Sequence, residues 1–245
     1  MIHDRTEALQ DNGQGAMYLS EHLLEINEGS GFLNALSVED RKTVRKLGTR
    51  CTFEKGQSIF HQGDSHTGVW IIEAGRARSY YVGPTGREIT LAFWTPGHFI
   101  GGPEVFGRGR HVWSGDAMED CEMIFLSGTS LHKLVREIPD VAMAVIDGLI
   151  SKGKCYSALI QMLGTRSVTE RLRQFLVIFA DTHGRHEGAS IVIDRSITYE
   201  QIAFIVGATR QWVTQTLDKL RADDVLEITR SEIIIHNLES LLDQV

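Results

Sequence analysis

Residues 197–220 read ITYEQIAFIVGATRQWVTQTLDKL, and their pattern predicts two short helices joined by a tight turn. Thr198 is a favourable N-cap, and Gln201 three residues later completes a capping box for the first helix. Gly207 lies where the chain must turn sharply, and glycine adopts the positive φ of such a turn at the lowest cost. Thr209 is placed to cap the second helix. This arrangement is typical of a helix-turn-helix.

The second predicted helix has one apolar face and one polar face. Val213 and Leu217 lie four residues apart, so both are expected to pack against the first helix. The polar face carries side chains that can hydrogen-bond base edges and phosphates: Arg210, Gln211, Thr214 and Gln215. Other residues in or beside this unit are candidates for phosphate contacts: Thr198, Thr209, Lys219, Arg221 and Arg230. The pattern therefore predicts that double-stranded DNA binds here.

Two short β-like runs follow, residues 225–228 and 232–236, and they flank Thr229-Arg230-Ser231. This is the pattern of a hairpin, which would make the unit a winged helix-turn-helix. The charge balance leaves a second interpretation open, because residues 165–245 contain nine Lys and Arg against twelve Asp and Glu. A winged helix with that balance could instead be a module that docks another protein.

The whole chain has 245 residues, of which 42% are hydrophobic, and this is enough for two domains with separate cores. Its formal net charge of −7 disfavours nonspecific binding to nucleic acid, which depends on a basic surface. No apolar run is long enough to span a membrane, and residues 1–15 lack the apolar core of a signal peptide. Cys51, Cys121 and Cys155 are few and widely spaced, as expected for reduced thiols. We therefore expect a cytoplasmic protein that binds no membrane and recognises DNA by its sequence.

The N-terminal half changes character along its length. Residues 1–30 form a polar extension that ends in a predicted helix over residues 16–24, and a further helix over residues 37–46 begins at the N-cap Ser37. Between residues 49 and 126, short β-like runs alternate with turn signals, as in a β-sandwich or barrel. The clearest runs are residues 58–60, 68–72, 77–81 and 89–93.

A short helix over residues 130–136 leads into a long predicted helix over residues 139–163. Two sets of residues recur every seven positions along the long helix: Leu149, Tyr156 and Leu163, and Val145, Lys152 and Leu159. This repeat predicts a two-stranded coiled coil and hence a homodimer. The alternative is a core helix that packs on its own β-domain.

A hinge is expected after the long helix. Gly164-Thr165-Arg166 interrupts the helical pattern. Ser167 and Glu170 then form a second capping-box pair, which predicts a new helix over residues 168–180.

These elements, in this order, resemble the CRP/FNR family of bacterial transcription regulators over about residues 31–237. Glycines fall at the turns of the family's β-roll: Gly56, Gly63, Gly75, Gly86, Gly97 and Gly101. The resemblance implies an α+β fold with an N-terminal cyclic-nucleotide-binding-type β-roll, a long dimerisation helix and a C-terminal winged helix-turn-helix. The implied boundaries are residues 1–30 for an extension, 31–137 for the effector domain, 138–165 for the dimerisation helix and hinge, and 166–245 for the DNA-binding domain.

The resemblance also implies a function. The family's effector domain gates the binding of a homodimer to a roughly palindromic DNA operator, and RNA polymerase is a further expected partner. Arg210 matches the family Arg that reads guanine, whereas Gln211 and Gln215 replace a Glu and an Arg. The operator is therefore expected to differ from the family's beyond that guanine. Trp212 has three open roles, since it could pack against the wing, against the first helix or against the DNA backbone.

The effector site departs from the pattern of the family's cyclic AMP binders. Gly102 occupies the position of the Glu that holds the ribose, and Glu104 comes two residues too late. His111-Val112 replaces the Arg-Ser pair that holds the phosphate, and Tyr156-Ser157 replaces a Thr-Ser pair at the adenine. We therefore expect a small organic effector other than cyclic AMP, with these candidate contacts: Gly101, Gly102, Glu104, Arg110, His111, Trp113, Tyr156 and Ser157. The alternative is that the rings fill the roll, which would leave a constitutive DNA binder without a ligand.

Other chemistries have less support in the sequence. The family's iron–sulfur sensors use an N-terminal cysteine cluster, so no such cluster is expected in a chain whose first cysteine is Cys51. Haem or another metal would need ligands from a small set without characteristic spacing: His61, His66, His98, His111 and Cys51 or Cys121. No nucleophile elbow, phosphate-binding glycine loop or His-Glu metal motif is present, so we expect no metal site and no enzymatic activity.

Overall fold

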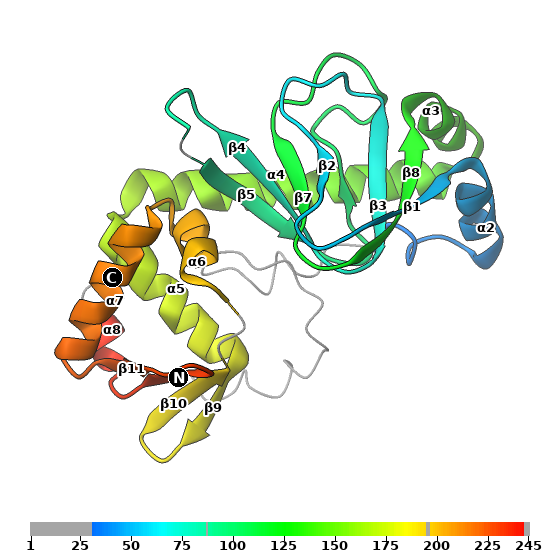
Figure 1. Cartoon of the computed structure of the whole chain (residues 1–245). Helices are drawn as coiled ribbons and strands as arrows, with labels where there is room; N and C mark the ends of the chain where they lie inside the picture. Colours follow the sequence, from blue (N-terminus) through cyan, green and yellow to red (C-terminus); the bar gives the residue numbers. More distant parts are fainter. Residues whose placement is uncertain (1–30, 87, 195–196, 243–245) are drawn as a thin grey trace. The chain divides into compact units, whose positions relative to one another are not determined.

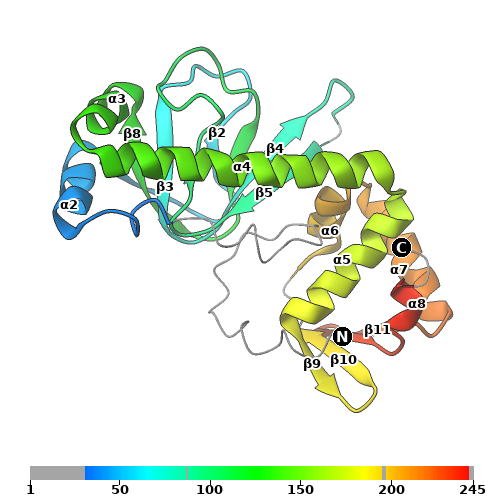
Figure 2. The ribbon, with the colours of Figure 1, turned by 180° about the vertical axis from the view of Figure 1, so that it is seen from behind.

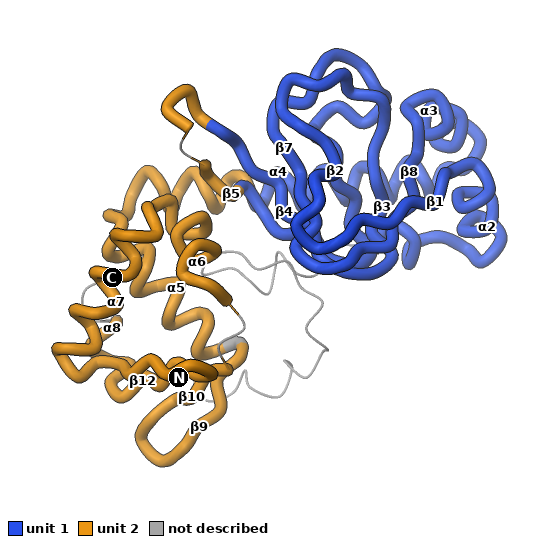
Figure 3. The backbone as a smooth tube through the Cα atoms, in the orientation of Figure 1, with its two compact units in different colours: residues 1–18, 22–82, 91–155 blue, residues 19–21, 83–90, 156–245 orange. Residues whose placement is uncertain are grey.

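The computed structural model describes residues 31–86, 88–194 and 197–242 (Figure 1). The helix predicted for residues 16–24 lies outside these residues. The chain forms two compact units (Figure 3), of which the first holds residues 31–82 and 91–155 and the second residues 83–90 and 156–242. No described helix is both long and apolar enough to cross a membrane.

The first unit contains a β-roll built from two four-stranded sheets, with the strand orders β1-β8-β3-β6 and β2-β7-β4-β5. The strands are β1 (Thr49–Phe53), β2 (Ser58–Phe60), β3 (Gly68–Ala74), β4 (Ala77–Val82), β5 (Glu88–Trp94), β6 (Phe99–Ile100), β7 (Ser114–Ala117) and β8 (Cys121–Ser127). β3 and β8 form the longest antiparallel pair, in which Ile71 is opposite Ile124. The all-β pattern predicted between residues 49 and 126 is confirmed, and the four clearest runs form β2, β3, β4 and β5.

Three helices pack against the sheet that contains β3 and β8: α2 (Val38–Leu47), α3 (Gly128–Glu137) and the first half of α4 (Pro139–Thr165). Figure 2 shows the first half of α4 lying across the strands. The helices and the sheet share one apolar core, which includes Val44, Ile71, Ile124, Leu131, Val141 and Val145. Each fully buried aliphatic side chain of this kind contributes roughly 1.5–3 kcal/mol of transfer free energy. The predicted caps are present, because the Ser37 hydroxyl accepts a hydrogen bond from the Asp40 N–H at 3.1 Å.

The long helix turns a different face outward from the one that the heptad pattern predicted. Val145 and Leu149 pack in the core of the roll, and Lys152 is only 5% exposed. The predicted seam is therefore wrong over the first half of α4, where the alternative of a core helix on its own β-domain holds. Large exposed apolar side chains form another line along the helix: Met143 (54% exposed), Ile146 (47%), Ile150 (51%) and Ile160 (69%). We call these four residues the α4 stripe.

The second unit holds α5 (Val168–His183), β9 (Gly184–Glu187), β10 (Ser190–Asp194), α6 (Tyr199–Val206), α7 (Arg210–Ala222), β11 (Leu226–Ile228), β12 (Glu232–Ile235) and α8 (Glu239–Leu242). Its four strands form an antiparallel sheet in the order β11-β12-β10-β9. The predicted hairpin is confirmed as β11 and β12, but the sequence analysis missed β9 and β10. The helices bury a separate core, which includes Leu172, Phe175, Val206, Val213 and Leu217.

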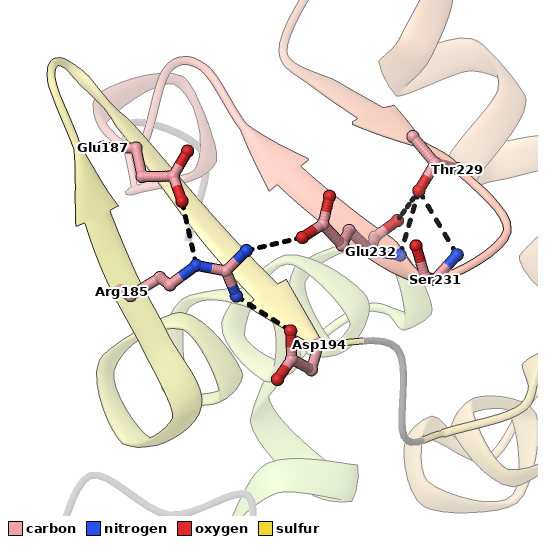
Figure 4. Close-up of polar contacts among 6 residues, drawn as sticks. All are labelled: Arg185, Glu187, Asp194, Thr229, Ser231 and Glu232. Carbon is pink, nitrogen blue, oxygen red and sulfur yellow. Dashed lines mark hydrogen bonds and ion pairs between the residues drawn. The ribbon is translucent and has the colours of Figure 1, made fainter.

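An arginine joins three strands of this second sheet (Figure 4). The Arg185 guanidinium reaches Glu187 at 2.9 Å on its own strand, Asp194 at 2.8 Å on β10 and Glu232 at 2.5 Å on β12. These carboxylates raise the pKa of Arg185, so its charge is permanent. The network is exposed to solvent, so we expect it to add little to the free energy of unfolding.

Candidate DNA-binding surface and effector site

The helix-turn-helix has the local geometry that its sequence predicts. The Thr198 hydroxyl accepts from the Gln201 N–H at 3.2 Å, and the Gln201 side-chain oxygen accepts from the Thr198 N–H at 2.8 Å, which completes the capping box. Gly207 ends α6 in the left-handed region, with φ at 66°. Thr209 caps α7 by accepting from the Trp212 N–H at 3.2 Å. The turn therefore fixes the direction in which α7 leaves α6.

Apolar packing anchors the inner face of α7, and a buried arginine on α5 holds the end of the preceding helix α6. Val213 and Leu217 are fully buried. Arg171, which is also buried, donates from Nε to the Val206 carbonyl at 2.8 Å and from Nη1 to the Arg166 carbonyl at 3.2 Å. Arg171 therefore ties the end of α6 to the start of α5. This role could not be predicted from the sequence, since nothing local distinguishes a buried arginine from a surface one.

The outer face of α7 presents the predicted base-reading residues to solvent. Arg210, Gln211 and Gln215 are exposed, and Thr214 is half-buried. The Thr214 hydroxyl donates to the Arg210 carbonyl at 3.0 Å, so its oxygen can act toward a ligand only as an acceptor. Trp212 is half-buried. The face thus combines a guanidinium with two amides, which together can read guanine and adenine edges.

The residues predicted to contact phosphates are exposed but differ in what they can offer. Thr198 and Thr209 use their oxygens as caps, and each hydroxyl proton can still be donated to a phosphate. Arg221 forms an ion pair of 3.1 Å with Asp218, which offsets part of its charge. Lys219 on α7 and Arg230 in the loop between β11 and β12 are exposed cations. Lys219 and Arg230 are therefore the stronger candidates for phosphate contacts.

In the first unit, the predicted effector residues Gly101 and Gly102 follow β6 and lie beside a pair of histidine rings. Both glycines have positive φ, 152° and 127°. A Cβ on Gly101 would lie 3.1 Å from the Gly68 carbonyl oxygen, whereas one on Gly102 would contact the His66 ring at 3.5 Å. The His111 Nδ1 atom lies 2.8 Å from the Gly101 carbonyl oxygen. Gly101 and His111 are thus brought together, as the resemblance implied.

The His111 ring belongs to a stack of aromatic side chains. Its centroid lies 4.2 Å from that of Phe60, 4.3 Å from that of His66 and 6.0 Å from that of Trp70, and the Trp70 ring also stacks on Phe60 at 5.3 Å. His66 is only 4% exposed, and neither of its ring nitrogens makes a hydrogen bond of normal geometry to a described residue. A buried polar group in that condition is unfavourable by about 1–3 kcal/mol. His66, which the sequence suggested only as a possible haem or metal ligand, is therefore also a candidate for the effector site.

Both histidines of the pair are held in the neutral form. Burial lowers the pKa of His66 from its ordinary value, while the Gly101 carbonyl and the Glu104 carboxylate act in the opposite direction. Burial also lowers the pKa of His111, and the proximity of His66 adds to that shift. The pair thus supplies neutral donors and acceptors at pH 7 where a cyclic AMP site supplies a cation.

The other predicted effector residues are already engaged or lie elsewhere. The Glu104 carboxylate accepts from the Phe106 N–H at 2.7 Å, and the Arg110 guanidinium donates to the Gly63 carbonyl at 2.5 Å. Trp113 is half-buried in the first unit. Tyr156 and Ser157 belong to the second unit, so their part in an effector site stays a prediction.

Of the predicted haem or metal ligands, the structure brings together His66 and His111. Among the described residues, no group of three or more His, Cys, Asp and Glu is arranged to hold a metal ion. His98 instead lies by Thr95, with its Nδ1 atom 3.2 Å from the Thr95 carbonyl oxygen. No disulfide joins Cys51, Cys121 and Cys155.

Known proteins match both units of the chain. Residues 50–137 match the family model for the cyclic nucleotide-binding domain, and residues 170–244 match that for the Crp-like helix-turn-helix domain. The Global nitrogen regulator of Synechocystis sp. is 27% identical over 195 residues, which cover 79% of this chain and 87% of that protein. The Nitrogen fixation regulation protein FixK of Bradyrhizobium diazoefficiens is 26% identical over 214 residues, which cover 87% of this chain and 86% of that protein.

A solved structure shares the fold. The c-di-GMP responsive global regulator CLP of Xanthomonas campestris superimposes with a TM-score of 0.72 at 17% identity, covering 82% of this chain and 99% of that one. Together with the helix-turn-helix geometry and the β-roll, these matches confirm the resemblance drawn from the sequence. The chain belongs to the CRP/FNR family of transcription regulators.

Proposed function

We propose that the protein is a homodimeric transcription regulator whose α7 reads a roughly palindromic DNA site and whose β-roll holds a small effector other than cyclic AMP. The observation that carries the DNA-binding part is the outer face of α7, where Arg210, Gln211 and Gln215 are exposed on a helix fixed by two caps and a buried inner face. An exposed polar face on a rigid helix is what base reading in the major groove requires.

The α4 stripe supports the dimer. Met143, Ile146 and Ile150 follow the alternating spacing of three and four residues that characterises a coiled-coil seam. Continuing that spacing reaches Gly153, Ser157 and Ile160, so the middle of the seam is built from small residues and its ends from large ones. A second copy of α4 would cover apolar side chains that are otherwise half exposed to water. The interface is therefore expected on this stripe and not on the seam first predicted.

Selection of oligonucleotides from a random pool by the purified protein tests the DNA-binding function. We expect enrichment of an inverted repeat whose half-sites are about one helical turn apart, each containing a guanine. A pool that stays random after several rounds would contradict the proposal and favour the docking-module interpretation. We further propose that the protein acts in the cytoplasm with RNA polymerase as a partner and without catalytic activity, a proposal supported by its membership of a family of transcription regulators.

The neutral His66 and His111 pair supports an effector without a phosphate. A phosphate anion in a buried site needs a cation, and both imidazoles are held neutral by burial. We propose that His66 extends the effector site predicted from the sequence, since neither of its ring nitrogens makes a hydrogen bond of normal geometry to a described residue. A thermal-shift screen with cyclic AMP, c-di-GMP and a panel of small organic acids tests this part. We expect no stabilisation by cyclic AMP and an increase in Tm with a member of the panel.

One observation favours a second candidate, a constitutive regulator with a ligand-free roll. Phe60, His111 and His66 stack closely, and these rings occupy the side of the roll next to Gly101 and Gly102. If the roll holds no ligand, no compound is expected to change the Tm of the protein. Its affinity for DNA should then be the same with and without a metabolite extract.

A further inference from the structure

Lys152 is a buried lysine at the contact between α4 and the β-roll. It lies on the inner face of the helix, opposite the α4 stripe, and is 5% exposed. Among the described residues, no carboxylate forms an ion pair with it. A buried ammonium group without a counter-ion is unfavourable, because its hydration is lost without an equivalent replacement.

The contacts of the amine are one carbonyl and two ring faces. Lys152 Nζ donates to the Phe99 carbonyl of β6 at 2.6 Å. It also lies 3.5 Å from the centroid of the Trp94 ring and 4.5 Å from that of the Phe99 ring. These faces attract a cation, but each contributes only about 0.5–2 kcal/mol, which is less than the desolvation that burial imposes.

The same helix face approaches β6 closely one turn earlier. A Cβ on Gly148 would lie 2.3 Å from the Phe99 ring, so only glycine allows α4 to sit this near to the strand. The Phe99 ring also packs edge-on against Phe32, with centroids 6.2 Å apart. Phe99 is therefore held at its ring by Gly148 and at its carbonyl by Lys152, and the position of α4 on β6 depends on both contacts.

The titratable groups that face Lys152 do not supply a negative charge at neutral pH. Burial lowers the pKa of Lys152 to about 7, and Cys155 on the same helix acts in the opposite direction. His98, in the loop before β6, has a pKa lowered to about 4 by burial and by Lys152 itself, so it is neutral. Burial raises the pKa of a thiol in general, which also favours its neutral form.

We propose that Lys152 is a proton-binding site that makes the position of α4 on β6 depend on pH. The neutral amine favours the arrangement described above, in which Nζ donates to the Phe99 carbonyl. The protonated amine favours an arrangement in which α4 shifts on β6 and Nζ reaches water. Because α4 also carries the α4 stripe, the shift would change the surface on which the proposed function places the second protomer.

The pH range follows from the two pKa values of the amine, about 7 in the buried arrangement and about 10.4 in water. Between these values the exposed amine binds a proton and the buried amine does not. Each unit by which pH falls in this range therefore favours the exposed arrangement by up to about tenfold. Below pH 7 both arrangements carry the proton, and no further change is expected.

An NMR titration of the full-length protein, with lysine labelled by ¹³C at the ε carbon, tests the proton site directly. One lysine signal is expected to titrate with a midpoint between about pH 7 and 10, below those of the other lysines, and to be absent in Lys152→Met, whose side chain has a similar length and no charge. Lys154→Met is the matched control, because Lys154 is an exposed lysine on the same helix, and it should keep the signal. Titration of every lysine above pH 10 in the unaltered protein would overturn the proposal, whether or not the variants fold.

The coupling to α4 is tested by the dimer dissociation constant, measured by sedimentation between pH 7 and 9. It is expected to change with pH in the unaltered protein and in Lys154→Met, and to be constant in Lys152→Met. Parallel pH profiles in the unaltered protein and Lys152→Met would overturn the coupling. An unaltered protein that is monomeric at every pH would instead count against the proposed dimer, which the NMR result does not depend on.

Discussion

The second unit exposes its candidate recognition residues on a helix, whereas the first unit buries its candidate effector residues in a stack of rings. Arg210 and Gln215 extend into solvent from α7, and the packing beneath them involves other residues. His66 and His111 form part of the roll's interior, where the proposed effector site and the packing of the roll would share the same side chains. The exposed face can thus change its specificity without loss of stability, while a change in the buried site alters both.

The α4 stripe is, like the outer face of α7, an exposed surface. A substitution in it is expected to have the largest effect, which is on the dimer dissociation constant. Ile150→Glu would bury an unpaired carboxylate from each protomer at the proposed dimer seam, which is unfavourable by several kcal/mol. The dimer dissociation constant is expected to rise by about 100-fold or more, as measured by sedimentation. The fold of the monomer should be unaffected.

Val38→Glu is the matched control for this change, because Val38 is an apolar residue of α2 with 66% exposure. It should leave the dimer intact. Equal weakening by both substitutions, or a dimer that survives Ile150→Glu, would remove the stripe from the interface.

Arg171 represents the buried class within the second unit. Arg171→Met would leave the carbonyls of Val206 and Arg166 without their donor, with a loss of about 2–4 kcal/mol in the free energy of unfolding. Urea denaturation followed by circular dichroism measures this loss. Arg221→Met, at an exposed arginine paired with Asp218, should change stability by less than about 0.5 kcal/mol. Similar free energies of unfolding for Arg171→Met and Arg221→Met would show that the buried hydrogen bonds of Arg171 contribute little to stability.

Arg210→Ala separates recognition from folding. The substitution should weaken binding to the selected operator by about 1–3 kcal/mol and leave the free energy of unfolding unchanged, because the side chain is exposed. Fluorescence anisotropy with labelled duplexes provides the affinity. Arg230→Ala serves for contrast, since loss of a phosphate contact should weaken binding to all duplexes equally. A loss of stability in Arg210→Ala would contradict the distinction between exposed residues, which affect binding alone, and buried residues, which also affect stability.

His66→Phe gives the smallest expected effect, and it depends on pH. The pKa of His66 is lowered in the folded protein, so the unfolded chain binds more protons as pH falls below 6.5 and the folded state loses stability in that range. Removing the imidazole should lessen this loss between pH 7 and 5.5, by about 1 kcal/mol at most. Urea unfolding at the two pH values measures it. His61→Phe, at an exposed histidine, should keep the loss of the unaltered protein, and identical losses in all three proteins would exclude a titrating role for His66.

Local features of the fold could be predicted from the sequence because their determinants lie within four residues of one another. The capping boxes of Ser167 with Glu170 and of Thr198 with Gln201, and the left-handed Gly207, all formed as expected. β9 could not be predicted because its sequence, GRHE, has no apolar alternation, and its place in the sheet is set by its pairing with β10.

Features that depend on distant residues could not be predicted in this way. α4 is apolar on two sides, one packed in the roll and one exposed as the α4 stripe, so a seven-residue repeat fits either face. His66 is 45 positions before His111, and only the fold stacks the two rings. The same holds for Lys152 and Phe99, which belong to different elements and meet because Gly148 lets α4 approach β6.

The most direct test of the account is parallel oligonucleotide selection with the unaltered protein and with Arg210→Ala. The unaltered protein is expected to enrich an inverted repeat with a guanine in each half-site. The variant should retain the repeat and its spacing but lose the preference at that base pair in both halves. The same preference in both selections would show that Arg210 does not read the base, and no enrichment by either protein would contradict sequence-specific DNA binding itself.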